Sequence, residues 1–188
     1  ASNTPNSWYY SKKMLYQTIK KNVESEGFTV LSDGLIMDDI NDYRPGVKAR
    51  NEEGVRSLLQ EAGLYKSEIR ELAKRAGVTN WNKTPSCSLA SRFPYGTRIT
   101  PEKVEAVFKA EEYFTKRGFE PVRVRVHQDL ARIEVGADQI EKLVKNHEEI
   151  NEMMQDLGFL FVTVDLQGYK YGRMNDQLDE KTKKAAVE

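Results

Sequence analysis

Residues 121–136 read PVRVRVHQDLARIEVG, and this stretch decides the fold of the second half of the chain. Apolar and charged residues alternate over 122–127 and again over 130–135. Strict alternation is typical of half-buried β-strands, because successive side chains point to opposite faces of a sheet. The pattern therefore predicts an antiparallel hairpin that turns at 127–130 and pairs Val126 with Ala131.

The charged residues of this hairpin share one face. In the predicted register, Arg125 lies opposite Arg132, and Arg123 lies opposite Glu134. Like charges directly opposite each other on a strand pair are destabilising. The face therefore indicates an anionic ligand that carries phosphate or carboxylate. The alternative is a solvated outer face, which is common in antiparallel sheets.

Helical patterns flank the hairpin. Thr100-Pro101 resembles a helix cap followed by proline at the first helical position. Apolar residues at helical spacing over 138–157 predict another helix, and the apolar run 159–166 predicts a last strand. The order helix-strand-strand-helix-strand predicts a small α+β domain over 99–176. The remaining residues, 177–188, form a polar tail.

The first half of the chain has a weaker pattern. A helix is predicted from the cap at Thr4-Pro5 to Gly27, and the apolar run 28–32 predicts a buried strand. A long ordered loop follows, and then a helix over 67–77. Residues 1–98 are therefore predicted to be part of an α/β sheet domain.

Composition narrows the class of protein. The 188 residues carry 29 Lys+Arg and 29 Asp+Glu, and this balance argues against a strongly basic nucleic-acid-binding protein. The chain contains no apolar run of membrane-spanning length, and ASNTPNSWYY lacks the features of a signal peptide. We therefore expect a cytoplasmic protein without nucleic-acid or membrane partners.

Cys87 is the only cysteine, and it lies in the polar segment TPSCSLASRFPYG. One cysteine excludes a disulfide framework, a CxxC pair and an iron–sulfur cluster held by this chain alone. A thiolate is the reactive form of cysteine, and a nearby arginine favours it. Local composition leaves two interpretations open, a nucleophile or sulfur donor and an inert buried thiol.

Six segments of the chain resemble one family, the LarE-type ATP-dependent sacrificial sulfur transferases of the PP-loop ATP pyrophosphatase superfamily. They are NTPxSWYY at 3–10, SDGLIMDDINDYRPGVKAR at 32–50, RSLLQEAGLYKSEIRELAKRAGVTNWNK at 56–83, PSCSLASRFPYGT at 85–97, VRVRVHQDLARIEV at 122–135 and GYKYGRMND at 168–176. The resemblance implies an α/β fold. It would comprise the C-terminal part of a PP-loop (adenine nucleotide alpha hydrolase-like) parallel-sheet domain, followed by the small α+β domain.

The resemblance also implies a reaction. With ATP and Mg2+, such enzymes adenylate a carboxylate of pyridinium-3,5-biscarboxylic acid mononucleotide, on the route to the nickel-pincer cofactor of lactate racemase. A cysteine thiolate displaces AMP, and cleavage of its C–S bond leaves a thiocarboxylate on the product and dehydroalanine on the protein. Cys87 occupies the donor position. A single cysteine favours this one-turnover chemistry, and no iron–sulfur cluster is expected. The family also suggests a homo-oligomer.

Further roles are implied residue by residue. They are Ser91 and Arg92 beside the donor cysteine, Trp8, Arg123 and Arg125 at the substrate, Asp33, Asp38, Asp39 and Arg44 in a nucleotide loop, and Glu111 and Glu134 at a metal. The family pattern has a third acidic residue in the metal set. This chain has Lys142 at that position, which is a departure from the family pattern. The alternatives are a buried helix face for Trp8 and solvated loop charge for the aspartates.

The family's S-G-G-x-D-S loop, whose backbone N–H groups cradle the pyrophosphate of ATP, does not occur in residues 1–188. We therefore expect this stretch by itself not to adenylate a carboxylate. Two other functions stay open on the sequence. One is a different PP-loop enzyme, such as a tRNA sulfurtransferase or an amide-forming synthetase. The other is a non-catalytic α+β module that binds a nucleotide and mediates assembly.

Overall fold

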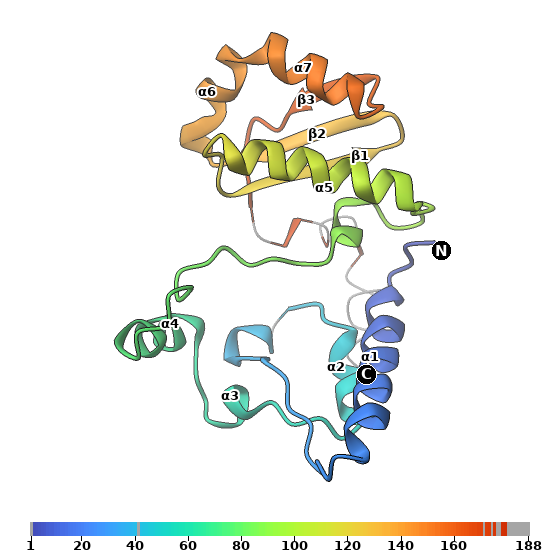
Figure 1. The fold of residues 1–188 in the computed structure, drawn as a ribbon, viewed down its shortest axis with the longest axis vertical. Helices are drawn as coiled ribbons and strands as arrows, with labels where there is room; N and C mark the ends of the chain where they lie inside the picture. Colours follow the sequence, from blue (N-terminus) through green and yellow to red (C-terminus); the bar gives the residue numbers. More distant parts are fainter. Residues whose placement is uncertain (1, 41, 171, 174, 176–177, 180–188) are drawn as a thin grey trace. The chain divides into compact units, whose positions relative to one another are not determined.

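The computed structural model describes residues 2–40, 42–170, 172–173, 175 and 178–179. These residues form two compact units, which are treated separately below (Figure 1). The sheet unit is formed by the described residues of Ala1–Thr4 and Thr84–Gln177, and the helical unit by those of Pro5–Lys83 and Leu178–Glu188. Most of the predicted tail at 177–188 lies outside the described residues.

The sheet unit contains a three-stranded mixed sheet in the order β1-β2-β3. Its strands are β1 (Val122–His127), β2 (Leu130–Val135) and β3 (Phe161–Val164). β1 and β2 are antiparallel, and Arg125 lies opposite Arg132. This pairing confirms the predicted hairpin and its register. β3 runs parallel to β2, so the chain must cross over between them.

Helices cover one face of this sheet (Figure 1). α5 (Pro101–Lys116) begins as predicted, with the Thr100 hydroxyl accepting from the Lys103 N–H. The crossover contains a 3-10 turn at Ala137–Gln139, followed by α6 (Ile140–Lys145) and α7 (His147–Asp156). The prediction of one helix over 138–157 is therefore wrong. The two helices meet at Asn146, whose backbone is not helical.

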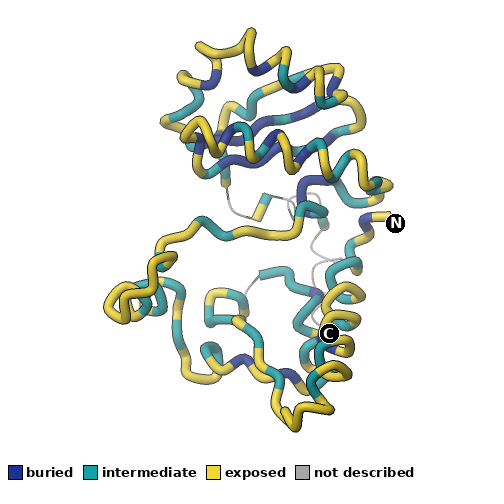
Figure 2. Tube along the Cα trace, in the orientation of Figure 1, coloured by how far each residue is buried: buried dark blue, intermediate teal, exposed yellow. Residues whose placement is uncertain are grey.

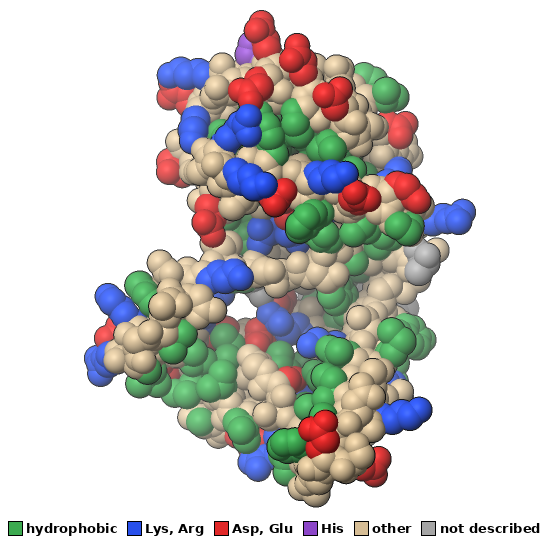
Figure 3. All heavy atoms as spheres, in the orientation of Figure 1, with side chains coloured by type: hydrophobic (Ala, Val, Ile, Leu, Met, Phe, Trp, Pro, Cys, Tyr) green, Lys and Arg blue, Asp and Glu red, His purple; other side chains and the backbone are tan. Residues whose placement is uncertain are grey.

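The main core lies between the sheet and these helices (Figure 2). Alternate residues of β1 and β2 point into it, and most are fully buried. Phe114 of α5 is fully buried and packs edge-on against Phe119, with ring centroids 5.8 Å apart. On the visible surface of the unit, acidic and basic side chains are interspersed (Figure 3).

Replacing Phe114 by alanine is expected to lower the free energy of unfolding by about 3–5 kcal/mol, because it leaves a cavity in a close-packed core. Phe108 lies on the same helix and is 55% exposed. Phe108→Ala is therefore a matched control, which should change stability by less than about 0.5 kcal/mol. Denaturant titration of both variants measures the difference. Equal losses would contradict this placement of the core.

The segment before α5 also belongs to the sheet unit. It contains the short 3-10 helix η2 (Leu89–Arg92), and Phe93 after it is 1% exposed within the core. The Asn3 amide donates to the Phe93 carbonyl at 2.8 Å. These contacts explain why the two units divide after Lys83, whereas the sequence placed the boundary after residue 98. The assignment of the first part to a PP-loop domain and of the second part to a separate α+β domain stays a prediction.

The helical unit has little regular structure besides helices. These are α1 (Ser7–Glu24), η1 (Met37–Asp39), α2 (Gly46–Glu52), α3 (Leu58–Glu61) and α4 (Lys66–Arg75). The strand predicted at 28–32 is absent, and Phe28 and Val30 are exposed. Only a single bridge joins Ser32 to Arg56. The predicted long loop contains both η1 and α2. None of the described helices has the length and apolar character needed to cross a bilayer.

Candidate functional site

Cys87 lies in an irregular segment that leads into η2, and its free thiol is exposed. The segment is held on both sides of the cysteine. Before it, the Arg123 guanidinium donates to the Pro85 carbonyl. After it, the Ser88 hydroxyl accepts from the Ala90 N–H at 3.3 Å and caps η2. The thiol is therefore presented to solvent on an anchored backbone.

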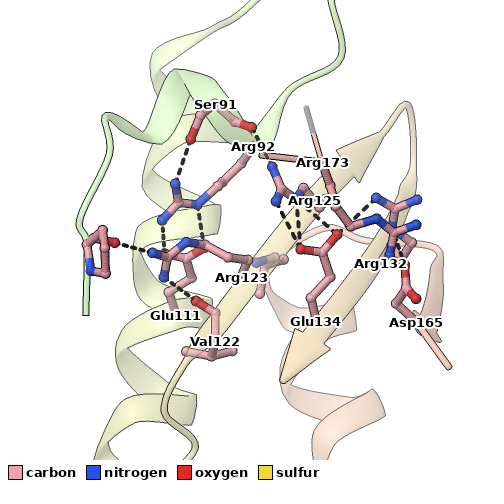
Figure 4. Close-up of polar contacts among 12 residues, drawn as sticks. Ser91, Arg92, Glu111, Val122, Arg123, Arg125, Arg132, Glu134, Asp165 and Arg173 are labelled. Atoms are coloured by element: carbon pink, nitrogen blue, oxygen red, sulfur yellow. Dashed lines mark hydrogen bonds and ion pairs between the residues drawn. The ribbon is translucent and has the colours of Figure 1, made fainter. Parts of the chain in front are cut away.

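Arg92 and Glu111 form a buried bidentate pair beside this segment (Figure 4). Arg92 is 4% exposed, and its Nε and Nη2 donate to the two carboxylate oxygens at 2.7 and 2.9 Å. Its Nη1 donates to the Ser91 hydroxyl at 2.6 Å. Glu111 also accepts from the Val124 N–H at 2.9 Å. Glu111 of α5 therefore fixes η2 against the first strand of the sheet.

Glu134 occupies the centre of the predicted cationic face (Figure 4). It is fully buried and accepts from Arg125 Nη2 at 2.9 Å and from Arg132 Nη2 at 3.0 Å. Arg125 Nη1 donates to the Ser91 carbonyl at 2.9 Å. The two opposed arginines are thus bridged by a carboxylate of the same sheet. The predicted need for an external anion between them is therefore met in part by the protein itself.

Two residues that sequence reasoning missed extend the cluster. Asp165 follows β3, and it pairs with Arg173 at 2.6 Å and with Arg132 Nε at 3.5 Å. Arg173 lies in the GYKYGRMND segment that the resemblance singled out, so a signal for it was present. No pattern marked Asp165, because it is a single acidic residue within the apolar run 159–166.

Arg123 differs from the other arginines of the cluster, because its contacts among the described residues are with carbonyl groups and an aromatic ring rather than with a carboxylate. It donates to the carbonyls of Val122 and Pro85 and lies over the Tyr169 ring, 5.2 Å from its centroid. Tyr169 is placed there by Gly168, where a Cβ would lie 2.7 Å from the Val135 carbonyl oxygen. Among the described residues, the cluster therefore contains five guanidinium groups and three carboxylates. They are Arg92, Arg123, Arg125, Arg132 and Arg173, with Glu111, Glu134 and Asp165.

The predicted metal ligands Glu111 and Glu134 do not converge on a metal position. Each is already bound by guanidinium groups, and the described residues contain no group of three or more His, Cys, Asp or Glu side chains that could hold an ion. Lys142, at the third family position, donates to the Arg117 carbonyl at 2.8 Å. The described residues therefore do not fit a bound metal, and the metal role of the two glutamates stays a prediction.

The predicted nucleotide-loop residues all lie in the helical unit and have local partners. Asp33 accepts from the hydroxyls of Ser57 at 2.6 Å and Tyr16 at 2.8 Å. Burial, followed by this bond to Asp33, raises the pKa of Tyr16. Asp38 caps α4 by accepting from the Lys66 N–H at 2.8 Å.

The remaining predicted residues of this unit are Asp39, Arg44 and Trp8. Asp39 forms an ion pair with Arg44 at 2.6 Å, and its other oxygen accepts from the Ile36 N–H. Trp8 lies on α1 and is half-buried. Local folding therefore explains the contacts of the acidic residues. Their roles in binding a nucleotide, and that of Trp8, stay predictions.

Three curated proteins resemble this chain over most of its length. One is the pyridinium-3,5-bisthiocarboxylic acid mononucleotide synthase of Lactiplantibacillus plantarum, 50% identical over 177 residues, which are 94% of this chain and 64% of that protein. The others are uncharacterized proteins of Synechocystis sp., 40% identical over 93% of this chain, and of Methanocaldococcus jannaschii, 30% identical over 89%. The chain spans slightly under two thirds of each relative, 64–66%. No family model matches it.

Proposed function

We infer the function of this chain on the premise that it belongs to the LarE-type family, to which it is related over 94% of its length. We propose that it takes part in ATP-dependent sulfur transfer, with Cys87 as the sulfur donor and pyridinium-3,5-biscarboxylic acid mononucleotide as the acceptor. The name of the Lactiplantibacillus plantarum relative, a synthase of the corresponding bisthiocarboxylic compound, supports this acceptor. The product would serve the biosynthesis of the nickel-pincer cofactor of lactate racemase.

The proposed step begins with a carboxylate that ATP has converted to an acyl adenylate. The Cys87 thiolate attacks the acyl carbon, a C–S bond forms, and AMP leaves with the electron pair of the C–O bond. A base then removes the Cα proton of Cys87. The Cβ–S bond breaks, and its electron pair leaves with the sulfur. The acceptor carries a thiocarboxylate, and residue 87 becomes dehydroalanine.

One observation carries this proposal. The only cysteine of the chain is exposed, and its backbone is tied through Pro85 to Arg123, which belongs to a cluster with more guanidinium than carboxylate groups. Positive charge beside the cysteine segment attracts an anionic acceptor. Ser91 and Arg92 are held rigidly by the pair with Glu111, as a binding surface requires.

ATP would supply the leaving group for the attack on the carboxylate. Because the described residues do not fit a metal, no step is derived through Mg2+. We propose the helical unit as part of a PP-loop domain and the whole protein as a cytoplasmic homo-oligomer. The support for these three assignments is the family relationship alone.

Mass spectrometry of the intact protein tests the proposal. After incubation with ATP and the pyridinium biscarboxylate mononucleotide, the peptide that contains Cys87 should lose the mass of one H2S. The same incubation without ATP is the control and should leave the peptide unchanged. Thiocarboxylate product formed beside an unchanged Cys87 peptide would refute sacrificial transfer by this residue.

A further inference from the structure

The backbone that carries Cys87 has no secondary structure of its own. Residues 83–88 lie outside every helix and strand, so their position depends on contacts with other elements. The Arg123 guanidinium of β1 supplies one such contact by donating to the Pro85 carbonyl, two residues before the cysteine. Whatever fixes this guanidinium therefore also fixes the backbone that leads to the sulfur donor.

Arg123 is a buried cation held by three contacts. It is 9% exposed, and burying a charge is unfavourable unless polar groups compensate for it. Two of the contacts are hydrogen bonds, to the Val122 carbonyl at 2.6 Å and to the Pro85 carbonyl (Figure 4). The third is aromatic, because the Tyr169 ring centroid lies 5.2 Å from the central carbon of the guanidinium. A ring face at this distance attracts a cation, so the ring helps to set where the guanidinium lies.

Tyr169 is itself held by the backbone of the sheet. Its N–H donates to the carbonyl of Val135, the last residue of β2, at 2.7 Å. The preceding Gly168 has a φ of +70°, and a Cβ at this position would lie 2.7 Å from the same carbonyl oxygen. Only glycine allows this close approach. The Tyr169 ring is therefore a fixed surface for the Arg123 guanidinium.

The proposed reaction needs a fixed backbone most in its second step. During attack on the acyl adenylate, rotation about the Cα–Cβ bond of Cys87 can bring the sulfur to the acyl carbon. During C–S cleavage, a base takes the Cα proton, the C–H electron pair forms the Cα=Cβ double bond, and the pair of the Cβ–S bond leaves with the sulfur. The Cα–H bond must then be aligned with the Cβ–S bond, and Cα is a backbone atom. A misplacement of about 1 Å can lower a rate about a hundredfold.

We propose that Tyr169 is a positioning residue for the sulfur donor, and that it acts on the backbone of Cys87 through the Arg123 guanidinium and the Pro85 carbonyl. The inference rests on the proposed function, because it assigns the effect to C–S cleavage. The ring contributes no proton, electron pair or hydrogen bond to this step. It determines where the Cα–H and Cβ–S bonds of residue 87 lie.

A nitroxide attached to Cys87 tests the link without any reaction. Cys87 is exposed and is the only cysteine, so the label attaches at one position. Tyr169→Leu should shorten the rotational correlation time of the label, because it releases the backbone before the cysteine. Tyr169→Phe keeps the ring and should behave as the parent protein. Tyr65→Leu, which removes an exposed ring from the helical unit, is the matched control and should leave the label unchanged.

Two results of this measurement would overturn the proposal. One is equal mobility of the label in Tyr169→Leu and in the parent protein. The other is a label that becomes equally mobile in Tyr169→Phe, because the ring would then not be the group that matters. If Tyr169→Leu does not fold, Arg123→Lys takes its place, since lysine keeps the charge but lacks the planar fork that reaches two carbonyl groups. The label should become more mobile in this variant, and an unchanged label would again overturn the proposal.

Intact-mass spectrometry of the whole protein separates the two chemical steps. After addition of ATP and the mononucleotide, residue 87 passes from the free thiol to a thioester adduct and then to dehydroalanine. Tyr169→Leu should slow the conversion of the adduct about tenfold and slow its formation less, so the adduct should accumulate. Tyr169→Phe should restore the ratio of the parent protein. General destabilisation would slow both steps by the same factor, and that result would overturn the positioning role.

Failure of the proposed function gives a different pattern. Absence of both the adduct and dehydroalanine in the parent protein would overturn sulfur donation by Cys87, and the role of Tyr169 in C–S cleavage with it, although the label would still report the tie. Cleavage at the parent rate in Tyr169→Leu, beside a mobile label, would overturn the positioning role alone. Sulfur transfer by Cys87 would then stand.

Discussion

Replacing Cys87 by alanine is expected to abolish thiocarboxylate formation completely and to leave the fold intact. The loss is complete because the chain has no second sulfur donor of this type, and no solvent nucleophile can supply the sulfur atom. The fold is unaffected because the thiol is exposed and contributes nothing to the core. We expect the free energy of unfolding to stay within about 0.5 kcal/mol of the parent protein. Product formation with ATP and the mononucleotide measures the first effect, and denaturant titration the second.

Cys87→Ser tests whether the reaction needs the sulfur atom itself or only a nucleophile at this position. A serine at this position is close in size, but an ester that it forms cannot yield a thiocarboxylate. Ser86→Ala, in an exposed neighbour, is the matched control and should retain the reaction. In the parent protein, product should not exceed one equivalent per chain, because each cysteine is consumed. Product formation by Cys87→Ala would contradict the donor role and would favour a catalyst whose sulfur comes from elsewhere.

The hairpin could be predicted to the residue because two physical signals agree in it. Alternation fixes which side chains face the core, and the short turn at Gln128 and Asp129 fixes the register. The placement of Arg125 opposite Arg132 follows from these signals alone. The prediction of a cationic face on the hairpin therefore needed no information from distant parts of the chain.

The charge balance of that face could not be predicted in the same way. Register placed Glu134 opposite Arg123, but its side chain turns to Arg125 and Arg132, and that choice depends on rotamers and burial. Asp165 contributes across a parallel pairing that joins residues far apart in sequence. Sequence reasoning therefore found the cations and underestimated the carboxylates that hold them.

The helical unit shows where short-range patterns are insufficient. The run 28–32 is apolar, yet Phe28 and Val30 are more than 60% exposed, because an apolar run becomes a strand only when another segment pairs with it. The break at Asn146 in the sheet unit also escaped the sequence pattern. The apolar spacing over 138–157 fits one helix, but the backbone angles of Asn146 end α6 and begin α7.

The second large effect is expected from Glu134, whose carboxylate is completely buried between two arginines. Glu134→Gln should lower the free energy of unfolding by about 3–5 kcal/mol, because it leaves two guanidinium groups close together without their shared counter-charge. The side chain keeps nearly the same volume, so the loss reports charge rather than packing. Denaturant titration measures it. Glu149→Gln, which removes an exposed carboxylate that pairs with Arg117, is the control and should have a far smaller effect.

A double-mutant cycle with Arg125→Gln shows whether the loss comes from the buried pair. When Arg125 is already absent, Glu134→Gln strands only Arg132, which is 30% exposed and has Asp165 as a second partner. The cost of removing Glu134 should therefore be smaller in this background than in the parent protein, and the two single losses should not add. Additive losses would show that Glu134 stabilises the sheet unit without help from Arg125. The bridging carboxylate would then not be what allows two arginines to lie opposite each other on neighbouring strands.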